Sequence, residues 1–517
     1  MRTFEIALVS ILALHFLVLF LKKENRPYWF KRIPVVALLV ATMQILLEGM
    51  RWQMYIAYAL AGIIALYALI GKIRNNKSNQ LNEPPKKSKR FLAILGAIFG
   101  IIAIVLNTFV ANFMPMPVLA EPNGPFEVGT TFYHIVDQER EEEATADTTD
   151  ARSLWVQVWY PAEETESYKR MPAMSESERF MGDLFEKYGF PYAAAGYFTS
   201  IMSHSYLDAP VKSGNQSFPI VLYSHGYKSG LSGNTQKAEA LASNGYVVFG
   251  IAHSYEAQIS LREDGSWLTR KDSNSVSLRK TAEADEDTVL LNRVELAEKQ
   301  MREIIGDPIN QKPEDRLMFD SLYHLIAAPF HDYLQIRAAD LGSVLDEIEQ
   351  MQNGSSESIF KGKLDVSRVG AFGASFGGPT CALFSATDPR CLASVNIDGS
   401  QLGILYKYSL NKPFMFFVGE YGWEELQHND WENIGNATPY YRIAIQGALH
   451  GNIGDQLFSS ALTRKLGILQ LGSINPNRVQ AIYNGYLLAF FDEHLKGKEQ
   501  PLLNGENRFE EARFKEY

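Results

Sequence analysis

The chain has 517 residues, of which 49 are lysine or arginine and 59 are aspartate or glutamate, so its formal net charge is −10. It is too long for one small domain, and its charge is unevenly distributed. Residues 1–119 contain 14 basic and 4 acidic residues, a net of +10, which leaves −20 for the rest of the chain. A domain this acidic repels the phosphates of nucleic acids, so we exclude nucleic acid as a partner.

Four apolar stretches open the chain, at residues 6–21, 33–47, 54–71 and 91–114. Each is close to the roughly 20 residues that cross a bilayer. A cleaved signal peptide does not account for them, because no small-residue cleavage site follows the first stretch and further apolar stretches come after it. The pattern predicts a four-span membrane anchor domain at residues 1–118, followed by an α/β domain at residues 119–517.

The connections between these stretches differ in charge. The first, at residues 22–32, contains five lysines and arginines, and the third, at residues 72–90, contains seven, whereas the second contains only Arg51. Because basic connections stay in the cytoplasm, we expect the residues after 114 to lie outside it. The sequence thus predicts a multi-pass protein of the cell membrane with an extracytoplasmic domain.

The start of the α/β domain is predicted to contain strands. Residues 123–137 and 154–160 are expected to pair as antiparallel strands. The apolar run at 218–223 predicts a buried strand, and it ends in Ser224-His225-Gly226-Tyr227. A loop in this place can lend a backbone N–H group to an oxyanion. We expect one donor to be Tyr227 N–H and the other to be Phe376 N–H, from the residue after the candidate nucleophile described below.

Residues 278–330 are strongly charged and have a helical apolar period, and a long helix is predicted after them at 333–351. An insertion at this point would lie above the carboxyl ends of the parallel strands, where it could form a cap over the site. A solvated helical hairpin without such a role explains the pattern equally well.

The pentapeptide Gly373-Ala374-Ser375-Phe376-Gly377 fits the G-x-S-x-G nucleophile elbow. Residues 367–372 before it predict a buried strand, and residues 378–384 after it predict the start of a helix, which is the context that the elbow requires. Small residues must flank the serine, because its backbone is strained and larger side chains would collide with the strand and the helix. Ser375 is therefore the candidate nucleophile. A glycine-rich turn that merely links a strand to a helix would give the same pattern.

A candidate general base lies downstream, where the predicted strand at 441–446 is followed by a loop that contains His450. Two carboxylates end strands between the serine and this histidine. Asp398 follows the predicted strand at 391–397, and Glu420 follows the one at 414–419. Either could orient the imidazole, and the spacing alone leaves both open.

Four runs together resemble the platelet-activating factor acetylhydrolase family: FPIVLYSHGY at 218–227, TQKAEALASNGYVVFGIAH at 235–253, LDVSRVGAFGASFGG at 364–378 and CLASVNID at 391–398. The resemblance spans most of residues 126–503 and implies an α/β-hydrolase fold, with a mostly parallel sheet and helices on both faces. In this family the acid follows the strand after the nucleophile helix. The resemblance therefore implies Ser375 as nucleophile, Asp398 as acid and His450 as base. The family often has histidine before the nucleophile, whereas this chain has Ala374, which leaves the substrate preference open.

Two further features of the α/β domain are its cysteines and its last helix. Cys381 and Cys391 are the only cysteines, and both fall where small apolar side chains are usually buried; whether they form a disulfide stays open. A last helix is expected at residues 476–496, because Asn475-Pro476 is a typical helix start and Gly497 a typical end. Its apolar face should pack on the sheet.

These features predict a serine carboxylic-ester hydrolase that forms an acyl-enzyme on Ser375 and needs neither a cofactor nor a metal ion. The resemblance implies short-acyl or phospholipid-like substrates, as for a 1-alkyl-2-acetylglycerophosphocholine esterase, and hence a role in lipid degradation. Two alternatives stay open: an amide or peptide hydrolase with the same residues, and a catalytically silent, membrane-anchored interaction domain on this scaffold. The sequence leaves the oligomeric state open.

Overall fold

The computed structural model describes residues 2–80, 90–113, 119–173, 201–262, 264, 266–269, 292–293, 295–297, 299–300, 330–400, 408–420, 438–455, 471–506 and 509–516. These residues separate into two compact units, one that ends at Phe113 and one that begins at Leu119. The cap expected at 278–330 lies almost entirely outside the described residues. Only short helical pieces within 292–300 and the first residue of the next helix are described.

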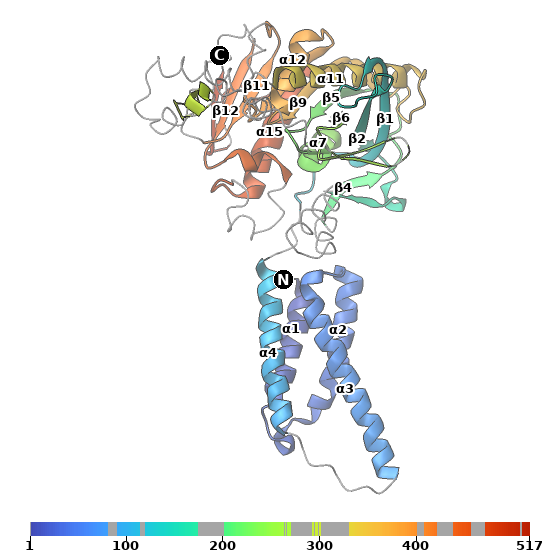
Figure 1. Cartoon of the computed structure of the whole chain (residues 1–517), viewed down its shortest axis with the longest axis vertical. Helices are drawn as coiled ribbons and strands as arrows, with labels where there is room; N and C mark the ends of the chain where they lie inside the picture. Colours follow the sequence, from blue (N-terminus) through green and yellow to red (C-terminus); the bar gives the residue numbers. More distant parts are fainter. Residues whose placement is uncertain are drawn as a thin grey trace. The chain divides into compact units, whose positions relative to one another are not determined.

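The first unit consists of helices (Figure 1). Its elements are α1 (Thr3–Val18), η1 (Lys23–Asn25), η2 (Tyr28–Arg32), α2 (Ile33–Glu48), η3 (Trp52–Met54), α3 (Tyr55–Gln80) and α4 (Arg90–Phe113). Small side chains such as Ala37, Ala57, Ala61 and Ala97 are fully buried where these helices meet. Many leucine, isoleucine and phenylalanine side chains point outward instead. Such a surface suits a lipid environment, in which helices associate through close packing of small residues.

Three stretches of this unit are long and apolar enough to cross a membrane, Tyr28–Glu48, Trp52–Ile73 and Arg90–Asn112, whereas four were expected. The difference lies in α1, which has only 16 residues. At 1.5 Å per residue this helix is about 24 Å long, shorter than the ~30 Å hydrocarbon core of a bilayer. The apolar run continues to Leu21, but the helix ends at Val18 and a turn follows. A fourth span therefore stays a prediction.

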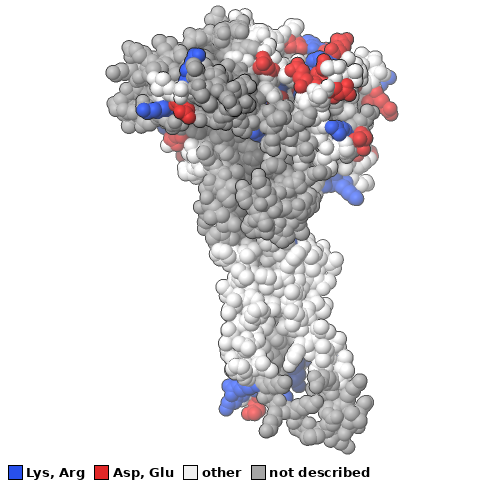
Figure 2. Space-filling model, viewed as in Figure 1, with Lys and Arg blue, Asp and Glu red and all other residues white. Residues whose placement is uncertain are grey.

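The charged side chains of the helical unit are arranged differently at its two ends. At the end where α1 begins, Arg51 is buried and binds both carboxylate oxygens of Glu5 at 3.0 Å. Arg2 also binds Glu5, so the charges at this end compensate one another. Figure 2 shows lysine and arginine gathered at one end of the unit and uncharged surface along the helices. This asymmetry agrees with the charge pattern from which the orientation was predicted.

The second unit is built on one large sheet (Figure 1), in which the described residues form eleven strands in the order β13-β12-β11-β10-β9-β5-β6-β2-β1-β4-β3. Their bounds are β1 (Glu127–Glu141), β2 (Ala151–Ala162), β3 (Arg170–Pro172), β4 (Met202–Leu207), β5 (Phe218–Ser224), β6 (Val247–Ala252), β9 (Leu364–Ala374), β10 (Cys391–Ile397), β11 (Phe414–Val418), β12 (Tyr440–Ile445) and β13 (Ala512–Glu516). The neighbours from β6 through β5 and β9 to β12 are all parallel. Strands β7 (Ile259–Leu261) and β8 (Trp267–Thr269) form a separate hairpin.

Helices cover both faces of this sheet. Helices α11 (Phe330–Asn353) and α12 (Gly377–Thr387) pack against one face, and α7 (Thr235–Ser243) and α15 (Pro476–Lys496) pack against the other. The strands between them are completely buried and rich in valine, isoleucine and phenylalanine, as expected for parallel strands covered on both sides. The α/β fold predicted from the sequence is therefore confirmed.

The last helix illustrates how local sequence sets its boundaries. The Asn475 side chain accepts hydrogen bonds from the N–H groups of Asn477 and Arg478, and Gly497 ends the helix with a φ of 65°. Both features are as predicted for an Asn-Pro start and a glycine end. The side chains of Tyr486, Phe490 and Phe491 are fully buried and attach the helix to the sheet.

The two cysteines are buried and do not form a disulfide. Cys381 lies on α12 and Cys391 begins β10, and both are free thiols. Burial raises the pKa of Cys391 to about 11. Both thiols therefore act as small apolar side chains of the core.

Candidate functional site

Ser375 lies on a sharp turn between a strand and a helix. Strand β9 ends at Ala374 and α12 begins at Gly377. The backbone of Ser375 has a φ of 53°, in the left-handed region that non-glycine residues rarely adopt. The turn is fixed by hydrogen bonds from Ser375 N to Ile397 O and from Gly378 N to Ser375 O, both 2.8 Å. This is the geometry of a nucleophile elbow, in which strain exposes the serine at the end of its strand.

The glycines on each side of Ser375 are required by close backbone contacts. A Cβ atom at Gly373 would lie 1.9 Å from the carbonyl oxygen of Gly377, and one at Gly377 would lie 2.0 Å from the carbonyl oxygen of Ser224. Both distances are far shorter than any real contact, and the atoms met belong to the backbone. Neither position can accept a side chain without moving the turn.

His450 contacts both Ser375 and Asp398. Its Nε2 atom lies 3.0 Å from Ser375 Oγ, and its Nδ1 atom lies 2.6 Å from Asp398 Oδ2. The other oxygen of Asp398 accepts the N–H of Gly419 at 3.1 Å. A carboxylate can only accept, so the imidazole proton lies on Nδ1, and Nε2 is left to accept from the serine hydroxyl. The Asp398 carboxylate is 3% exposed, whereas the imidazole is 47% exposed.

Glu420, the alternative acid, does not take this position. Its Oε2 atom accepts the N–H of Gly447 at 2.6 Å, and its own N–H binds Ala448 O at 2.8 Å. Glu420 thus holds the base of the loop that carries His450. Of the two carboxylates that the sequence left open, the one in contact with the imidazole is Asp398.

The residues expected to supply the oxyanion donors are neighbours of Ser375 or of Gly226, which contacts it. Tyr227 follows Gly226 in the loop after β5, and a Cβ atom at Gly226 would be 3.2 Å from Ser375 Cβ. Phe376 precedes α12, where backbone N–H groups are not used by the helix itself. The rings of Tyr227, Phe376 and Phe330 contact one another, with centroids 5.4 to 6.0 Å apart. The loop after β5 and an aromatic cluster therefore lie next to the turn, and the role of the two N–H groups stays a prediction.

A buried lysine supports the segment that begins with His450. This segment is a short 3-10 helix, η9 (His450–Ile453). Lys237 on α7 is completely buried, and its Nζ atom donates to Ile453 O at 2.7 Å and to Gln480 Oε1 at 3.2 Å. Burial lowers the pKa of Lys237 to about 8. Sequence reasoning missed this contact, although a lysine within the apolar face of a short helix was a usable signal.

Sequence reasoning also missed a buried polar network behind the loop after β5. It links Ser224, His225, His253, Glu256, Arg337 and Asp340, all of which are less than 9% exposed. The signal was present in α11, where Arg337 and Asp340 are one helical turn apart on the face that packs against the sheet. Charged residues on a buried face require partners.

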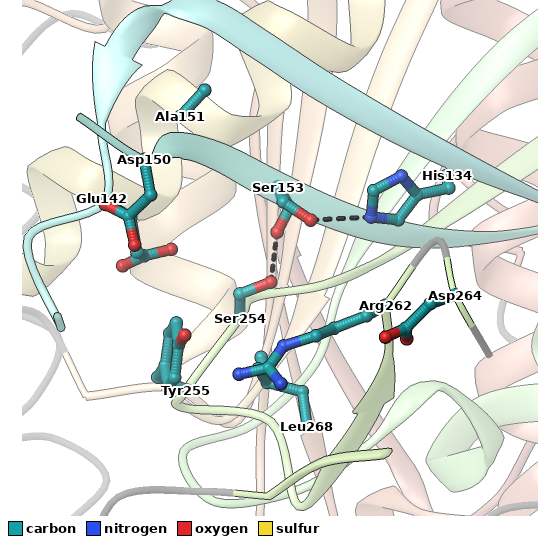
Figure 3. Close-up of a pocket in the computed structure, with 10 residues that line it drawn as sticks. All are labelled: His134, Glu142, Asp150, Ala151, Ser153, Ser254, Tyr255, Arg262, Asp264 and Leu268. Atoms are coloured by element: carbon teal, nitrogen blue, oxygen red, sulfur yellow. Dashed lines mark hydrogen bonds between the residues drawn. The ribbon is translucent and has the colours of Figure 1, made fainter. Parts of the chain in front are cut away.

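A separate pocket of about 610 Å³ lies between β1, β2 and the segments after β6 (Figure 3). His134 and Ser153 are hydrogen-bonded on its wall, with 2.6 Å between Nε2 and Oγ. Arg262 and Asp264 line it from the β7–β8 hairpin. None of the ten residues drawn in Figure 3 is Ser375, Asp398 or His450. The part of the chain described by the structure contains no group of three or more histidine, cysteine, aspartate or glutamate residues that could hold a metal ion.

A family model matches most of this chain. The model for "Platelet-activating factor acetylhydrolase, isoform II" covers residues 113–305 and 333–510. The chain belongs to this family. Membership supports a hydrolase of carboxylic esters and confirms the resemblance seen in the sequence.

Two relatives are each named platelet-activating factor acetylhydrolase. The platelet-activating factor acetylhydrolase of Gallus gallus is 21% identical over 361 residues, which are 68% of this chain and 77% of the relative. That of Canis lupus familiaris is 22% identical over 384 residues, 69% and 78% of the two chains. Among solved structures, a ferulic acid esterase from Streptomyces cinnamoneus matches with a TM-score of 0.54 and 21% identity, over 77% of this chain and 99% of its own. At this identity the match shows the fold.

Proposed function

We propose that this protein is a membrane-anchored serine esterase that uses Ser375 as nucleophile, His450 as general base and Asp398 as the residue that orients His450. The observation that carries the proposal is the pair of contacts made by His450, 3.0 Å to Ser375 Oγ and 2.6 Å to Asp398 Oδ2, on a serine held in a nucleophile elbow. Nucleophile, base and orienting group are then within hydrogen-bond reach of one another, as covalent catalysis requires.

The proposed reaction has two halves. In the first, Ser375 Oγ attacks the ester carbonyl carbon while His450 Nε2 takes the hydroxyl proton, and the N–H groups of Tyr227 and Phe376 stabilise the oxyanion. The bond to the alcohol then breaks, and His450 gives its proton to the departing oxygen. In the second half, His450 removes a proton from water, which attacks the acyl group on Ser375. The acid leaves and the serine is restored.

For the substrate, we propose esters with a short acyl group and an apolar, phospholipid-like alcohol. The names of the relatives support an acetyl group. The aromatic cluster of Tyr227, Phe330 and Phe376 supports an apolar portion next to the reacting bond. A membrane anchor would hold the site near such lipids.

The substrate class is tested with matched acetyl, butyryl and dodecanoyl p-nitrophenyl esters and an acetyl anilide, using the full-length protein in detergent. We expect kcat/KM to be highest for the acetyl ester. It should exceed that of the anilide by more than about 100-fold, because an ester has the better leaving group and each ~1.4 kcal/mol in the barrier is tenfold in rate. An anilide cleaved as fast as the ester would favour an amidase. Turnover of the dodecanoyl ester alone would contradict the short-acyl substrate, and no turnover at all would favour a silent scaffold.

We further propose that the hydrolase unit lies outside the cytoplasm. Twelve basic residues in the first and third connections support this orientation, against Arg51 in the second. In intact cells, a cysteine at Ser88 in the third connection should resist an impermeant thiol reagent. A cysteine at Thr148, in the exposed loop between β1 and β2, should react. The native thiols of Cys381 and Cys391 are buried, so labelling of the wild-type protein gives the background. Labelling of Ser88→Cys with protection of Thr148→Cys would reverse the orientation.

A further inference from the structure

The peptide group between Gly226 and Tyr227 is held from its carbonyl side. Gly226 O accepts a hydrogen bond from the Nδ1–H group of His225 at 2.7 Å and another from Ser229 N at 3.1 Å. In a trans peptide the C=O and N–H groups point in opposite directions. Fixing the Gly226 oxygen therefore fixes the direction of Tyr227 N–H, which is one of the two proposed oxyanion donors.

The tautomer of His225 is set by His253, the residue directly after β6. Its Nε2 atom accepts the backbone N–H of His253 at 3.2 Å, so the ring proton lies on Nδ1 and faces Gly226 O. The side chain is completely buried. Burial, together with the positive charge of Arg337 and the neighbouring His253, lowers the pKa of His225 well below its usual value. The ring is thus neutral, with one donor and one acceptor, and both are used.

The imidazole ring of His253 is itself held by two hydrogen bonds. Its Nδ1 atom lies 2.8 Å from Asp340 Oδ2, and its Nε2 atom lies 2.9 Å from Ser224 Oγ. The series Ser224–His253–Asp340 repeats the residue types of the candidate site. All three residues are 0% exposed, so no substrate reaches Ser224. Asp340 also binds Arg152 at 2.7 Å, and that guanidinium anchors the network to β2. Hydrogen bonds join Ser224 to His253 and His253 to Asp340, and a buried series of bonds of this kind is rigid.

Arg337 contacts both segments that carry the proposed oxyanion donors, the loop after β5 and the turn before α12. Its Nη1 atom donates to His225 O at 2.8 Å, and its Nε atom binds Glu256 Oε2 at 2.7 Å. The guanidinium lies 4.6 Å from the ring centroid of Phe376, the residue that bears the other proposed donor. One buried side chain from α11 therefore contacts both donor segments.

From these contacts we infer that His225 is a positioning residue, whose Nδ1–H group directs the Tyr227 N–H toward the oxyanion formed on Ser375, with the Ser224–His253–Asp340 chain as its anchor. The inference rests on the proposed function. It assigns no proton transfer to His225, which touches neither the substrate nor the reacting atoms.

Two amide substitutions separate this role from a merely structural one. The asparagine amide nitrogen occupies nearly the place of histidine Nδ1, so His225→Asn keeps a donor for Gly226 O. The longer glutamine places its amide near Nε2, so His225→Gln can still bind the His253 N–H but loses that donor. Both variants are polar and each loses one hydrogen bond. A difference between them in kcat therefore reports the Gly226 contact.

The test compares the full-length variants with an acetyl ester and with a trifluoromethyl ketone, whose adduct with Ser375 places an oxyanion between the same donors. We expect His225→Gln to lose roughly 30- to 100-fold in kcat with KM within about threefold, since removal of one oxyanion donor costs about 10²- to 10³-fold. The ketone should bind more weakly by a similar factor. His225→Asn should stay within about fivefold of wild type in both measurements.

Tyr246→Phe is the matched control. It removes another hydrogen bond of a buried side chain, 2.7 Å from the Tyr246 hydroxyl to Asp492, and should lower only the melting temperature. Equal kcat for the two His225 variants, or a change confined to KM, overturns the assignment while leaving the esterase intact. A wild-type protein that neither hydrolyses the ester nor binds the ketone overturns the proposed function, and the assignment with it.

Discussion

Replacing Ser375 by alanine is expected to lower kcat for the acetyl ester by about 10⁴- to 10⁶-fold, the usual cost of losing the nucleophile of a Ser-His-Asp site. Among the residues that the structure describes, we expect no second hydroxyl to take its place. Ser224, which is bound to His253, is completely buried, and Ser153, which is bound to His134, lines the separate pocket, whose lining does not include Ser375. The measurement is the initial rate of ester hydrolysis by wild-type and variant full-length protein at saturating substrate.

The control for this variant is Ser385→Ala, a substitution of the same kind at a buried position of α12. It should keep kcat within about twofold of wild type, because Ser385 lies near the end of α12, away from the turn that carries Ser375. Ser375→Ala should also melt within a few degrees of wild type. Residual activity of Ser375→Ala within tenfold of wild type would remove Ser375 from the mechanism.

Asp398→Asn is expected to lower kcat by about 10⁴-fold, because an amide at this position favours the wrong imidazole tautomer. The amide nitrogen can donate to His450 Nδ1, and the ring proton would then move to Nε2, which must accept from Ser375. The 2.6 Å contact between His450 and Asp398 is the basis of this expectation. The measurement is kcat at saturating acetyl ester.

Glu420→Gln is the matched comparison. Glutamine keeps an oxygen that can accept the Gly447 N–H, so the loop should stay in place and kcat should change by less than about tenfold. The melting temperatures of both variants show whether each is folded. If Glu420→Gln were the inactive variant and Asp398→Asn the active one, the orienting role would pass to Glu420.

The elements around the elbow could be predicted from the sequence because strong local constraints determine them. Gly373 and Gly377 meet backbone oxygens at about 2 Å if a Cβ is added, so these glycines mark the turn directly. The buried strands β5 and β10 were found as apolar runs, and β10 matches its expected range. Asn475 and Gly497 bounded α15 correctly.

Other features depend on contacts between distant residues, which local patterns do not encode. The choice between Asp398 and Glu420 was one of these, because both follow strands and only the folded loop shows which carboxylate faces His450. The contact from His225 to Gly226 O depends on the tautomer that His253 imposes across the sheet. Edge strand β13 was also missed, since it pairs with β12 only after α15 returns the chain to the sheet.

For the first expected membrane span, the local pattern was clear but longer than the helix that forms. Composition alone marked residues 6–21 as apolar, but α1 ends at Val18 and is about 24 Å long. Apolar length overestimates helix length wherever a turn interrupts the run before the charged connection begins.

The central claim, that Ser375 is an activated nucleophile, is tested most directly by mapping its covalent adduct. The full-length protein is incubated with a fluorophosphonate, digested and examined by peptide mass spectrometry. We predict one adduct per chain, on the peptide that contains Ser375, with loss of ester hydrolysis in proportion to labelling and no labelling of Ser375→Ala. A protein that hydrolyses esters while Ser375 stays unmodified, or an adduct on another serine that abolishes activity, would contradict the account.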